Sequence, residues 1–370
     1  GRFCCLRSLN VTGGEKGILL LYNEIMHKII KIIFYNLIIF FSLLILSEII
    51  FGYWFTKDNF GIHMRQERNK NWYTISKMNN IEYKFYYKRN FYGFRGEEFD
   101  PKEVKILWSG GSTSNQRYTP EELTIVGRLN KKFSSDGINI KIFNAGRDGK
   151  TLNGVIYDFN HWFTKIKNFR PEFVVLLLGV NERSLAQDID ERQFDVSTQE
   201  KKIDRTKDYF KNNSFFYSKY KKIANKYFPK NTNGYFLDSK KLYTNFEYVD
   251  YKKAKNLKRT ISEKDQKIVV QLEKRLLILK KKFKLNKIKP LIITQVTYSG
   301  LSDQKLFLVN EKIKEFSKDN DWPIIKLDEL IKMDPYDFYD EVHTTPKGSE
   351  KISNLIYPYL KEILYNKNQL

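Results

Sequence analysis

Short apolar runs that end in turns alternate along this chain with stretches of helical spacing. The runs, with their turns, lie at 104–108, 138–151, 173–182, 289–298 and 322–330. Apolar runs of about four to eight residues between turn signals are typical of strands that are buried on both faces. Parallel strands need a crossover, which is usually a helix. The alternation therefore predicts an α/β fold, a three-layer α/β/α sandwich around a mostly parallel sheet.

Three stretches have the apolar spacing of helices that would cover such a sheet. The stretch at 119–133 offers Thr119 as an N-cap and Pro120 at the first helical position. The stretch at 302–318 lies between the last two predicted strands, and the stretch at 262–284 has the same spacing. We expect an ordered helix in each.

Residues that can carry chemistry follow the predicted strands. Ser112 comes after the first, the turn 144–151 after the second and Asn181 after the third, while Asp340 and His343 lie near the C-terminus. In parallel sheets, ligands bind beyond the carboxyl ends of the strands. We therefore expect these residues to meet at one edge of the sheet.

Ser112 has the sequence context of a nucleophile. Gly110 and Gly111 precede it and let the backbone turn tightly, which exposes the hydroxyl. A serine hydroxyl needs a base, and His343 is the only histidine near another motif. Asp340 can hold its far ring nitrogen and stabilise the imidazolium. The alternatives are a helix-capping role for Ser112, a structural role for His343 and an N-cap role for Asp340.

The turn NAGRDGKT at 144–151 allows two interpretations. It ends in the Gly-Lys-Thr of a phosphate-binding loop, but the glycine that such a loop needs five positions earlier is Asn144 here. We favour a different anion, the oxyanion of a tetrahedral acyl intermediate. Its donors are the backbone N–H groups of Ser112 and Gly149 and the side-chain amide of Asn181. Alternatively, Asn181 only ends its strand in a turn.

These four blocks resemble, in the same order, those of the SGNH (GDSL-type) hydrolase family. The resemblance covers 104–182 and 289–364, about 155 of the 370 residues. It implies a flavodoxin-like hydrolase domain formed by 104–182 and 289–370. The implied triad and oxyanion hole consist of Ser112, His343 and Asp340, and of Ser112, Gly149 and Asn181. Gly111 and Glu182 depart from the family pattern, which usually has Asp at both positions.

The resemblance implies a serine esterase that hydrolyses acyl esters, with O-acetyl groups on cell-envelope polysaccharide as candidate substrates. One alternative is an O-acyltransferase on the same scaffold. Another is a catalytically silent protein that binds envelope carbohydrate. The stretch NFYGFRGEEF at 90–99 is similar to a lead-in of membrane-anchored bacterial members.

We expect no metal or other cofactor. The four histidines, at 27, 63, 161 and 343, have no metal-type spacing, and the two cysteines are the adjacent Cys4 and Cys5. Three basic residues near the motifs, Arg95, Arg147 and Lys150, allow two roles. They are either substrate anchors or surface charges, and we favour surface charges.

An apolar run at 32–55 predicts a membrane-spanning helix, since about 20 apolar residues cross a bilayer. We assign 26–56 as an uncleaved signal-anchor, 1–25 as an upstream extension and 57–103 as a stem. The alternative is a buried core helix. Basic residues flank both ends and do not set the orientation. We expect a single-pass membrane protein with its catalytic domain on the extracytoplasmic, periplasmic side, and Glu48 at the interface.

The net charge of +22 is concentrated in one segment. Residues 201–290 hold 27 Lys and Arg against 8 Asp and Glu. They belong to a basic insertion at 183–288, which we interpret as a lid or a docking element. Its charge suits a solvated helical surface, which we favour, or a face for anionic lipid headgroups or acidic polysaccharide. Single-stranded nucleic acid suits it least, and no nucleic-acid partner is expected.

Overall fold

The chain divides into two compact units. In the computed structural model, one unit comprises Gly1–Lys57 and Arg205–Ile223, and the other Asp58–Asp204 and Ala224–Leu370. The residues that the structure describes are 12–52, 54, 55, 60, 64, 67–187, 210, 213–217, 219, 220, 223, 236–239 and 247–365.

The second unit is built on a five-stranded parallel sheet, as predicted. Its strand order is β4-β3-β5-β7-β8. The strands are β3 (Ile106–Gly110), β4 (Ile142–Asn144), β5 (Phe173–Leu177), β7 (Lys289–Ile293) and β8 (Ile324–Ile325). The strand predicted at 322–330 is reduced to the two residues of β8, and α12 (Leu327–Leu330) follows it.

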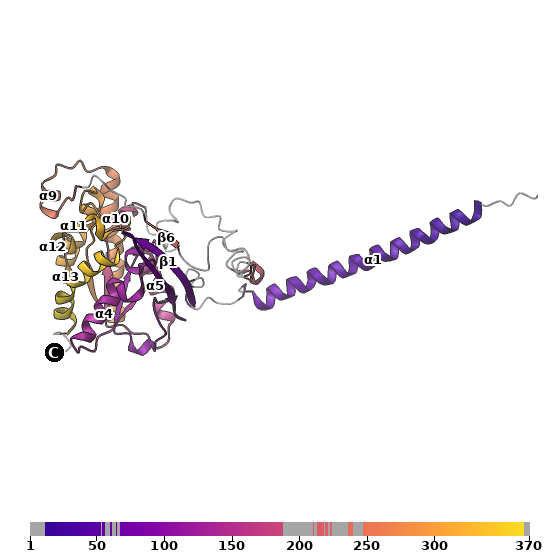
Figure 1. Ribbon diagram of the computed structural model, residues 1–370, viewed down its shortest axis with the longest axis horizontal. Coiled ribbons are helices and arrows are strands. Elements are labelled where there is room, and N and C mark those ends of the chain that lie inside the picture. Colours follow the sequence, from indigo (N-terminus) through magenta and orange to yellow (C-terminus); the bar gives the residue numbers. More distant parts are fainter. Residues whose placement is uncertain are drawn as a thin grey trace, which may run out of the picture. The chain divides into compact units, whose positions relative to one another are not determined.

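Helices cover both faces of this sheet, which confirms the three-layer prediction. Alternate residues of a strand point to opposite faces. Leu107 of β3 therefore packs with α5 (Leu152–His161), α10 (Glu263–Asn286) and α11 (Gln304–Asp319). Its neighbours Ile106 and Trp108 pack with α4 (Ile125–Ser135) and α13 (Pro346–Tyr365). Figure 1 labels these helices.

The helix α10 is part of one of these layers, although it lies within the predicted insertion. Its residues Leu272, Leu276 and Leu279 are fully buried in the core beside α5 and α11. Ser262 and Asp265 start the helix with a capping box, in which each side chain accepts a hydrogen bond from the other residue's backbone N–H. The predicted helix is confirmed. Most of the remaining insertion lies outside the described residues.

The predicted start of α4 was wrong. Its N-cap is Thr124, whose hydroxyl accepts a hydrogen bond from the Gly127 N–H at 2.9 Å. A short 3-10 helix, η2 (Glu121–Leu123), separates Thr119 from α4. The carbonyl of Thr119 instead accepts a hydrogen bond from Arg95. The helix predicted at 302–318 is confirmed as α11, and Asp303 caps it.

A second, three-stranded sheet has the order β2-β1-β6. The hairpin of β1 (Lys70–Met78) and β2 (Ile81–Arg89) turns at Asn79 and Asn80, both with positive φ, as the favoured two-residue hairpin turn requires. The strand β6 (Phe236–Asp238) pairs with β1 in parallel. Isolated bridges join Arg95 to Arg89 and to Asn144, so Arg95 connects this hairpin with the edge of the main sheet.

The remaining elements of this unit are short. They are η1 (Pro101–Glu103), α3 (Ser112–Asn115), η3 (Phe163–Lys165), η4 (Glu182–Ser184), α9 (Tyr251–Asn256) and η5 (Pro335–Asp337).

The first unit contains one long helix, α1 (Thr12–Phe51), shown in indigo in Figure 1. Its stretch of 28 residues from Glu24 to Phe51 is, by length and mean hydropathy, sufficient to cross a membrane, and this stretch is not buried. At 1.5 Å per residue it extends about 42 Å, more than the roughly 30 Å of a bilayer's hydrocarbon core. A core helix of a soluble protein would be mostly buried, so the exposure argues against that alternative.

Candidate active site

Ser112, His343 and Asp340 form one hydrogen-bonded chain. Ser112 is the first residue of α3, directly after the β3 turn. Its Oγ lies 2.6 Å from Nε2 of His343, and Nδ1 of His343 lies 2.7 Å from Oδ2 of Asp340. The structure thus brings together three residues that are up to 231 positions apart in the sequence.

Asp340 is placed to hold the imidazole in one tautomer. Its Oδ1 accepts hydrogen bonds from the backbone N–H groups of Val342 and His343, at 2.9 and 2.8 Å. Burial alone would raise the pKa of Asp340, but the hydrogen bonds and charge of His343 and these N–H groups outweigh it and lower the pKa. An ionised Asp340 accepts a hydrogen bond from Nδ1–H, which leaves Nε2 unprotonated and able to accept the proton of Ser112.

Tyr339 fixes the plane of the imidazole. The two rings stack with centroids 5.5 Å apart and planes 8° from parallel. The Tyr339 N–H also donates to the His343 carbonyl at 3.0 Å. Burial raises the pKa of Tyr339 well above its usual value, so the phenol stays neutral beside Asp340. The sequence analysis did not predict this residue.

Gln116 ties the serine turn to the histidine loop. Its Nε2 donates to Oγ1 of Thr344 at 3.0 Å and to Oγ of Ser349 at 2.6 Å. Its Oε1 accepts the N–H of Ile125, the first residue of α4, at 2.7 Å. The sequence analysis missed Gln116, because a single glutamine in a loop has no periodic or motif signal.

Asn181 lies where the serine turn and the 144–151 turn meet. Its Nδ2 donates to the Lys150 carbonyl at 2.8 Å, and a Cβ added to Gly111 would lie 2.1 Å from the same Nδ2. The amide therefore lies against Gly111, the residue before Ser112, and beside the peptide that joins Lys150 to Thr151. Gly149 has a φ of +69°, in the left-handed region that favours glycine.

Several bonds hold the 144–151 turn to the serine turn. Asn144 donates through Nδ2 to the Ser114 carbonyl, and Asn115 donates through Nδ2 to Asp148, both at 2.8 Å. The backbone N–H of Arg147 donates to the Gly110 carbonyl at 3.1 Å. Arg117 adds an ion pair with Asp148. The two turns are thus positioned before any ligand binds.

Glu182 connects Asn181 to the start of α5. Its carboxylate accepts the Gly179 N–H at 2.9 Å and interacts with the backbone of Leu152. Burial raises the pKa of Glu182 above its usual value. The residue that departs from the family pattern thus positions the turn that carries Asn181.

Lys150 is buried, so its interpretation as a surface charge was wrong. Its Nζ donates to Asp158 and to the Ala145 carbonyl, both at 2.7 Å, and to Ser109 at 3.1 Å. Burial lowers the pKa of Lys150 to about 8. In a phosphate-binding loop the lysine ammonium contacts the bound phosphates. Here the ammonium is bound to protein groups instead, which argues against the phosphate-loop interpretation.

Arg95 and Arg147 are also buried, with 5% and 8% of their surface exposed. The surface-charge interpretation was therefore wrong for both. Arg95 donates to the carbonyls of Asn115, Gln116 and Thr119 and so braces the backbone after Ser112.

A buried charged cluster lies next to Arg147. Burial alone would raise the pKa of Glu67, but the charges of Arg147, Lys70 and Arg89 outweigh it and lower the pKa to about 2. Arg89 also donates to the Gly146 carbonyl at 2.8 Å and to Oδ1 of Asn115 at 3.2 Å. The β1–β2 hairpin thereby supports both turns of the site.

A polar hollow of about 230 Å³ is lined mainly by residues of the 297–303 loop after β7, together with Arg183 and Glu341. Its lining includes Arg183, Tyr298, Ser299, Ser302 and Glu341. Arg183 is held by an ion pair with Asp303. Within the described part of the chain, no group of three or more His, Cys, Asp or Glu residues is arranged to hold a metal ion.

Comparisons with known proteins give similarity to solved structures only. No family model matches the sequence, and no curated protein matches it either. A lipolytic protein of the G-D-S-L family from Veillonella parvula is 13% identical; the match covers 71% of this chain and 98% of that one, with a TM-score of 0.38.

An acetylxylan esterase from Geobacillus stearothermophilus is 12% identical, over 71% of this chain and 94% of that one, with a TM-score of 0.40. A GDSL-like lipase from Bacteroides thetaiotaomicron is 13% identical, over 73% and 93% of the two chains, with a TM-score of 0.36. At these scores, the chemistry of this chain has to be argued from its own site.

Proposed function

We propose that this chain is a membrane-anchored serine esterase of the SGNH type. The observation that carries the proposal is the chain of hydrogen bonds from Ser112 through His343 to Asp340, at 2.6 and 2.7 Å. Both distances are within the range that a nucleophile, its base and an orienting carboxylate require.

In the first step, Oγ of Ser112 attacks the carbonyl carbon of an acyl ester, and Nε2 of His343 takes the hydroxyl proton. Asp340 stabilises the imidazolium that forms. The carbonyl oxygen becomes an oxyanion, and the N–H groups of Ser112 and Gly149 and the amide of Asn181 donate to it. Asn181 has two amide protons, and one of them is bound to the Lys150 carbonyl, which leaves the second for the oxyanion.

The tetrahedral intermediate then collapses. The bond to the alcohol breaks, and His343 returns its proton to that leaving group. A water molecule attacks the acyl-serine while His343 accepts one of its protons. The second tetrahedral intermediate collapses as the bond from the acyl carbon to Oγ of Ser112 breaks and His343 returns the proton to Oγ, which releases the carboxylic acid and restores Ser112. In a transferase, a sugar hydroxyl would replace water in this half of the cycle.

We propose acylated carbohydrate of the cell envelope, such as an O-acetyl ester, as the substrate. The polar hollow beside the site supports this choice. Hydroxyl-bearing and charged residues line it, namely Tyr298, Ser299, Ser302, Arg183 and Glu341, and residues of these types suit a polyhydroxylated ligand. The apolar stretch from Glu24 to Phe51 would anchor the enzyme as a single-pass protein. The proposal places the catalytic unit on the extracytoplasmic side, where such carbohydrate occurs.

Ester hydrolysis and fluorophosphonate labelling of the full-length protein in detergent test this function. We expect hydrolysis of p-nitrophenyl acetate to fall at least about 10³-fold in Ser112→Ala and covalent labelling by a fluorophosphonate to disappear. Ser135→Ala is the matched control, because Ser135 is exposed on α4, away from the site residues. Equal labelling of Ser112→Ala and wild type, or no turnover above the Ser112→Ala rate, would contradict the proposal.

A further inference from the structure

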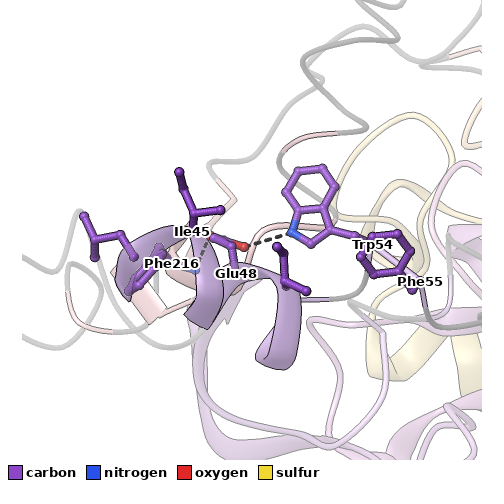
Figure 2. A pocket seen from close by; sticks show the side chains of 7 residues that line it. Ile45, Glu48, Trp54, Phe55 and Phe216 are labelled. Carbon is purple, nitrogen blue, oxygen red and sulfur yellow. Dashed lines mark hydrogen bonds between the residues drawn. The ribbon is translucent and has the colours of Figure 1, made fainter. Parts of the chain in front are cut away.

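A carboxylate within the apolar helix binds a segment that follows it by more than 160 positions. Glu48 of α1 accepts hydrogen bonds from the Ser214 hydroxyl at 2.5 Å and from the backbone N–H groups of Phe215 and Phe216 at 2.9 and 3.0 Å. The indole Nε1 of Trp54 donates to it at 3.0 Å. Figure 2 shows Glu48 between Trp54 and Phe216.

Four protein donors therefore satisfy this carboxylate. An unpaired charge near a bilayer is costly, and charged residues in membrane helices usually have a specific partner. Ser214 also accepts the Tyr217 N–H at 3.0 Å, so the same hydroxyl orders the start of the short helical turn at 215–217. Glu48 thus does more than mark the end of the apolar run.

Aromatic contacts extend this attachment. The ring of Phe51 lies 5.4 Å from that of Phe215, and the ring of Trp54 meets that of Phe210 edge to face, also at 5.4 Å. Contacts of this geometry contribute beyond the apolar area that they bury. Residues 214–216 and the ring of Phe210 are therefore fixed to the C-terminal end of α1 by polar and apolar contacts together.

The attached segment leaves large apolar and aromatic side chains exposed. Phe210, Tyr220 and Ile223 have 57%, 68% and 56% of their surface exposed, and Phe55 after the helix has 80%. A groove of about 510 Å³ runs between these parts (Figure 2), lined by α1 side chains such as Leu44, Ile45 and Ile49 and by Trp54, Phe55 and Phe216. Aromatic rings are enriched where a membrane meets water.

The same segment is basic. Residues 205–223 contain six Lys and Arg against one Asp. Basic residues next to a leaflet that contains anionic lipids are attracted to its headgroups. The ammonium of Lys219 lies over the Phe215 ring, 5.3 Å from its centroid. A basic side chain that covers an aromatic ring in this way keeps its charged end near water.

We propose that 210–223 is a second membrane contact, which Glu48 docks onto the end of the span and which lies in the interface of an anionic phospholipid bilayer. Its exposed aromatic side chains enter the headgroup region, an acyl chain occupies the groove, and its basic side chains bind lipid phosphates. The inference rests on the proposed membrane anchoring and does not depend on the esterase activity. This part of the basic insertion is then a membrane contact rather than a lid.

Site-specific fluorescence on the full chain tests this inference. Cys4 and Cys5 are the only cysteines, so their replacement by serine gives a background for single labels. A fluorophore is attached to the cysteine of Tyr220→Cys, and its fluorescence is measured with the protein in phosphatidylcholine vesicles that contain phosphatidylglycerol. We expect quenching by shallow spin-labelled lipid and protection from iodide in water. Labels at Ile38→Cys, in the span, and Leu285→Cys, exposed on α10, provide the membrane and water references.

Glu48→Leu is the decisive variant. It removes the acceptor but keeps the helix apolar, so the Ile38 label should stay in the bilayer while the Tyr220 label loses lipid quenching and becomes accessible to iodide. Glu24→Leu is the matched control, because Glu24 pairs only with Lys28 at the other end of the stretch among the ion pairs of the described residues. Ser214→Ala removes one donor and should give a partial loss.

The outcomes separate the two proposals. If the Ile38 label is accessible to iodide, the membrane anchor itself is wrong. If the Ile38 label lies in the bilayer but the Tyr220 label in the unmodified background is quenched by iodide alone, the anchor stands and the second contact is overturned. Unchanged lipid quenching of the Tyr220 label in Glu48→Leu overturns the docking role of Glu48. Equal quenching in vesicles without phosphatidylglycerol overturns the role of the basic side chains.

Discussion

Gly111, directly before Ser112, is constrained by space and not by backbone conformation. Its φ of −81° and ψ of −150° are accessible to any residue. A Cβ at this position would lie 2.1 Å from Nδ2 of Asn181 and 3.1 Å from the Lys150 carbonyl. In this chain the proposed oxyanion donor therefore occupies the volume that a side chain at this position would need.

The variant Gly111→Ala should displace the Asn181 amide and lower kcat about 10²-fold, since the loss of one oxyanion donor costs about that much. KM should change little, because the donor acts mainly in the transition state. Steady-state hydrolysis of p-nitrophenyl acetate measures both constants.

The control for this prediction is Gly137→Ala. Gly137 has nothing within 4 Å of an added Cβ, but its φ of +68° makes alanine strained by about 1 kcal/mol. It should lower the Tm and leave kcat unchanged. A Gly111→Ala enzyme with normal kcat would remove Asn181 from the proposed oxyanion hole.

The carboxylate of Asp340 should matter through the tautomer of His343. Asp340→Asn keeps the size of the side chain but can donate to Nδ1, which then places the imidazole proton on Nε2 and prevents it from accepting the Ser112 proton. We expect kcat to fall about 10⁴-fold, as in other serine triads. Fluorophosphonate labelling rates and kcat should fall together. If kcat fell by less than about tenfold, Asp340 would not be needed to orient the imidazole of His343.

At the scale of elements, the β1–β2 hairpin supports the site through buried charges. Glu67, with 24% of its side chain exposed, forms ion pairs with Lys70 and Arg89. Its pKa of about 2 in the folded protein lies below the roughly 4.3 of an unfolded glutamate. The stability that it contributes is therefore complete above about pH 4.3 and is lost as the pH falls towards 2.

Glu67→Gln should consequently lower the free energy of unfolding at pH 7, by at most about 3 kcal/mol. The difference from wild type should shrink steadily below about pH 4. Urea unfolding of the detergent-solubilised protein at several pH values measures this. A difference that stays constant from pH 7 down to pH 3 would show that the ionised carboxylate is not what Glu67 contributes.

Substitutions in the helix α10 test whether this part of the predicted insertion unfolds together with the core of the catalytic unit or separately from it. Leu276 is fully buried against the core, whereas its neighbour Leu277 is 43% exposed. Leu276→Ala should lower the free energy of unfolding by about 2–5 kcal/mol, because it leaves a cavity. Leu277→Ala should change it by less than about 0.5 kcal/mol. Similar effects of both variants on thermal unfolding would mean that α10 is not part of the cooperative core.

The elements that the sequence predicted well are those with strong local signals. The run at 173–182 and the periodic stretch at 262–284 gave β5 and α10. The start of α4 was misplaced because Thr119 and Thr124 both look like N-caps, and a tertiary bond from Arg95 decides between them. The hairpin was missed, although alternating residues around Asn79 and Asn80 offered a usable signal.

The residues of the candidate site also differ in whether the sequence carries a local signal for them. Ser112, Asp340 and His343 could be identified because each has a short motif whose chemistry is recognisable. Gln116 and Tyr339 could not, since they act on these residues through contacts that only the folded chain creates. Burial of Lys150 was likewise invisible, because its partner Asp158 is an ordinary acidic residue eight positions away.

At the scale of the whole molecule, the excess positive charge and the proposed catalytic residues belong to different parts of the sequence. Residues 201–290 account for +19 of the net charge of +22. The site residues Ser112, Asn181 and His343 all lie outside that segment. Catalysis and membrane attachment should therefore be separable by truncation, provided that the 58–370 chain retains its sheet.

A chain of residues 58–370 should keep its kcat on p-nitrophenyl acetate within about twofold, because none of the proposed catalytic groups is removed. The same truncated chain lacks Glu48. Segment 205–223 therefore loses the carboxylate that accepts its hydrogen bonds but keeps its basic residues.

We expect no binding of this chain to phosphatidylcholine vesicles. We expect weak binding to phosphatidylglycerol vesicles that disappears with added salt, since salt screens exposed charges. Vesicle sedimentation measures this, and deletion of 205–223 should abolish the weak binding. Binding to neutral vesicles would reveal a membrane contact outside both segments, and a large fall in kcat would mean that the N-terminal helix contributes to the site.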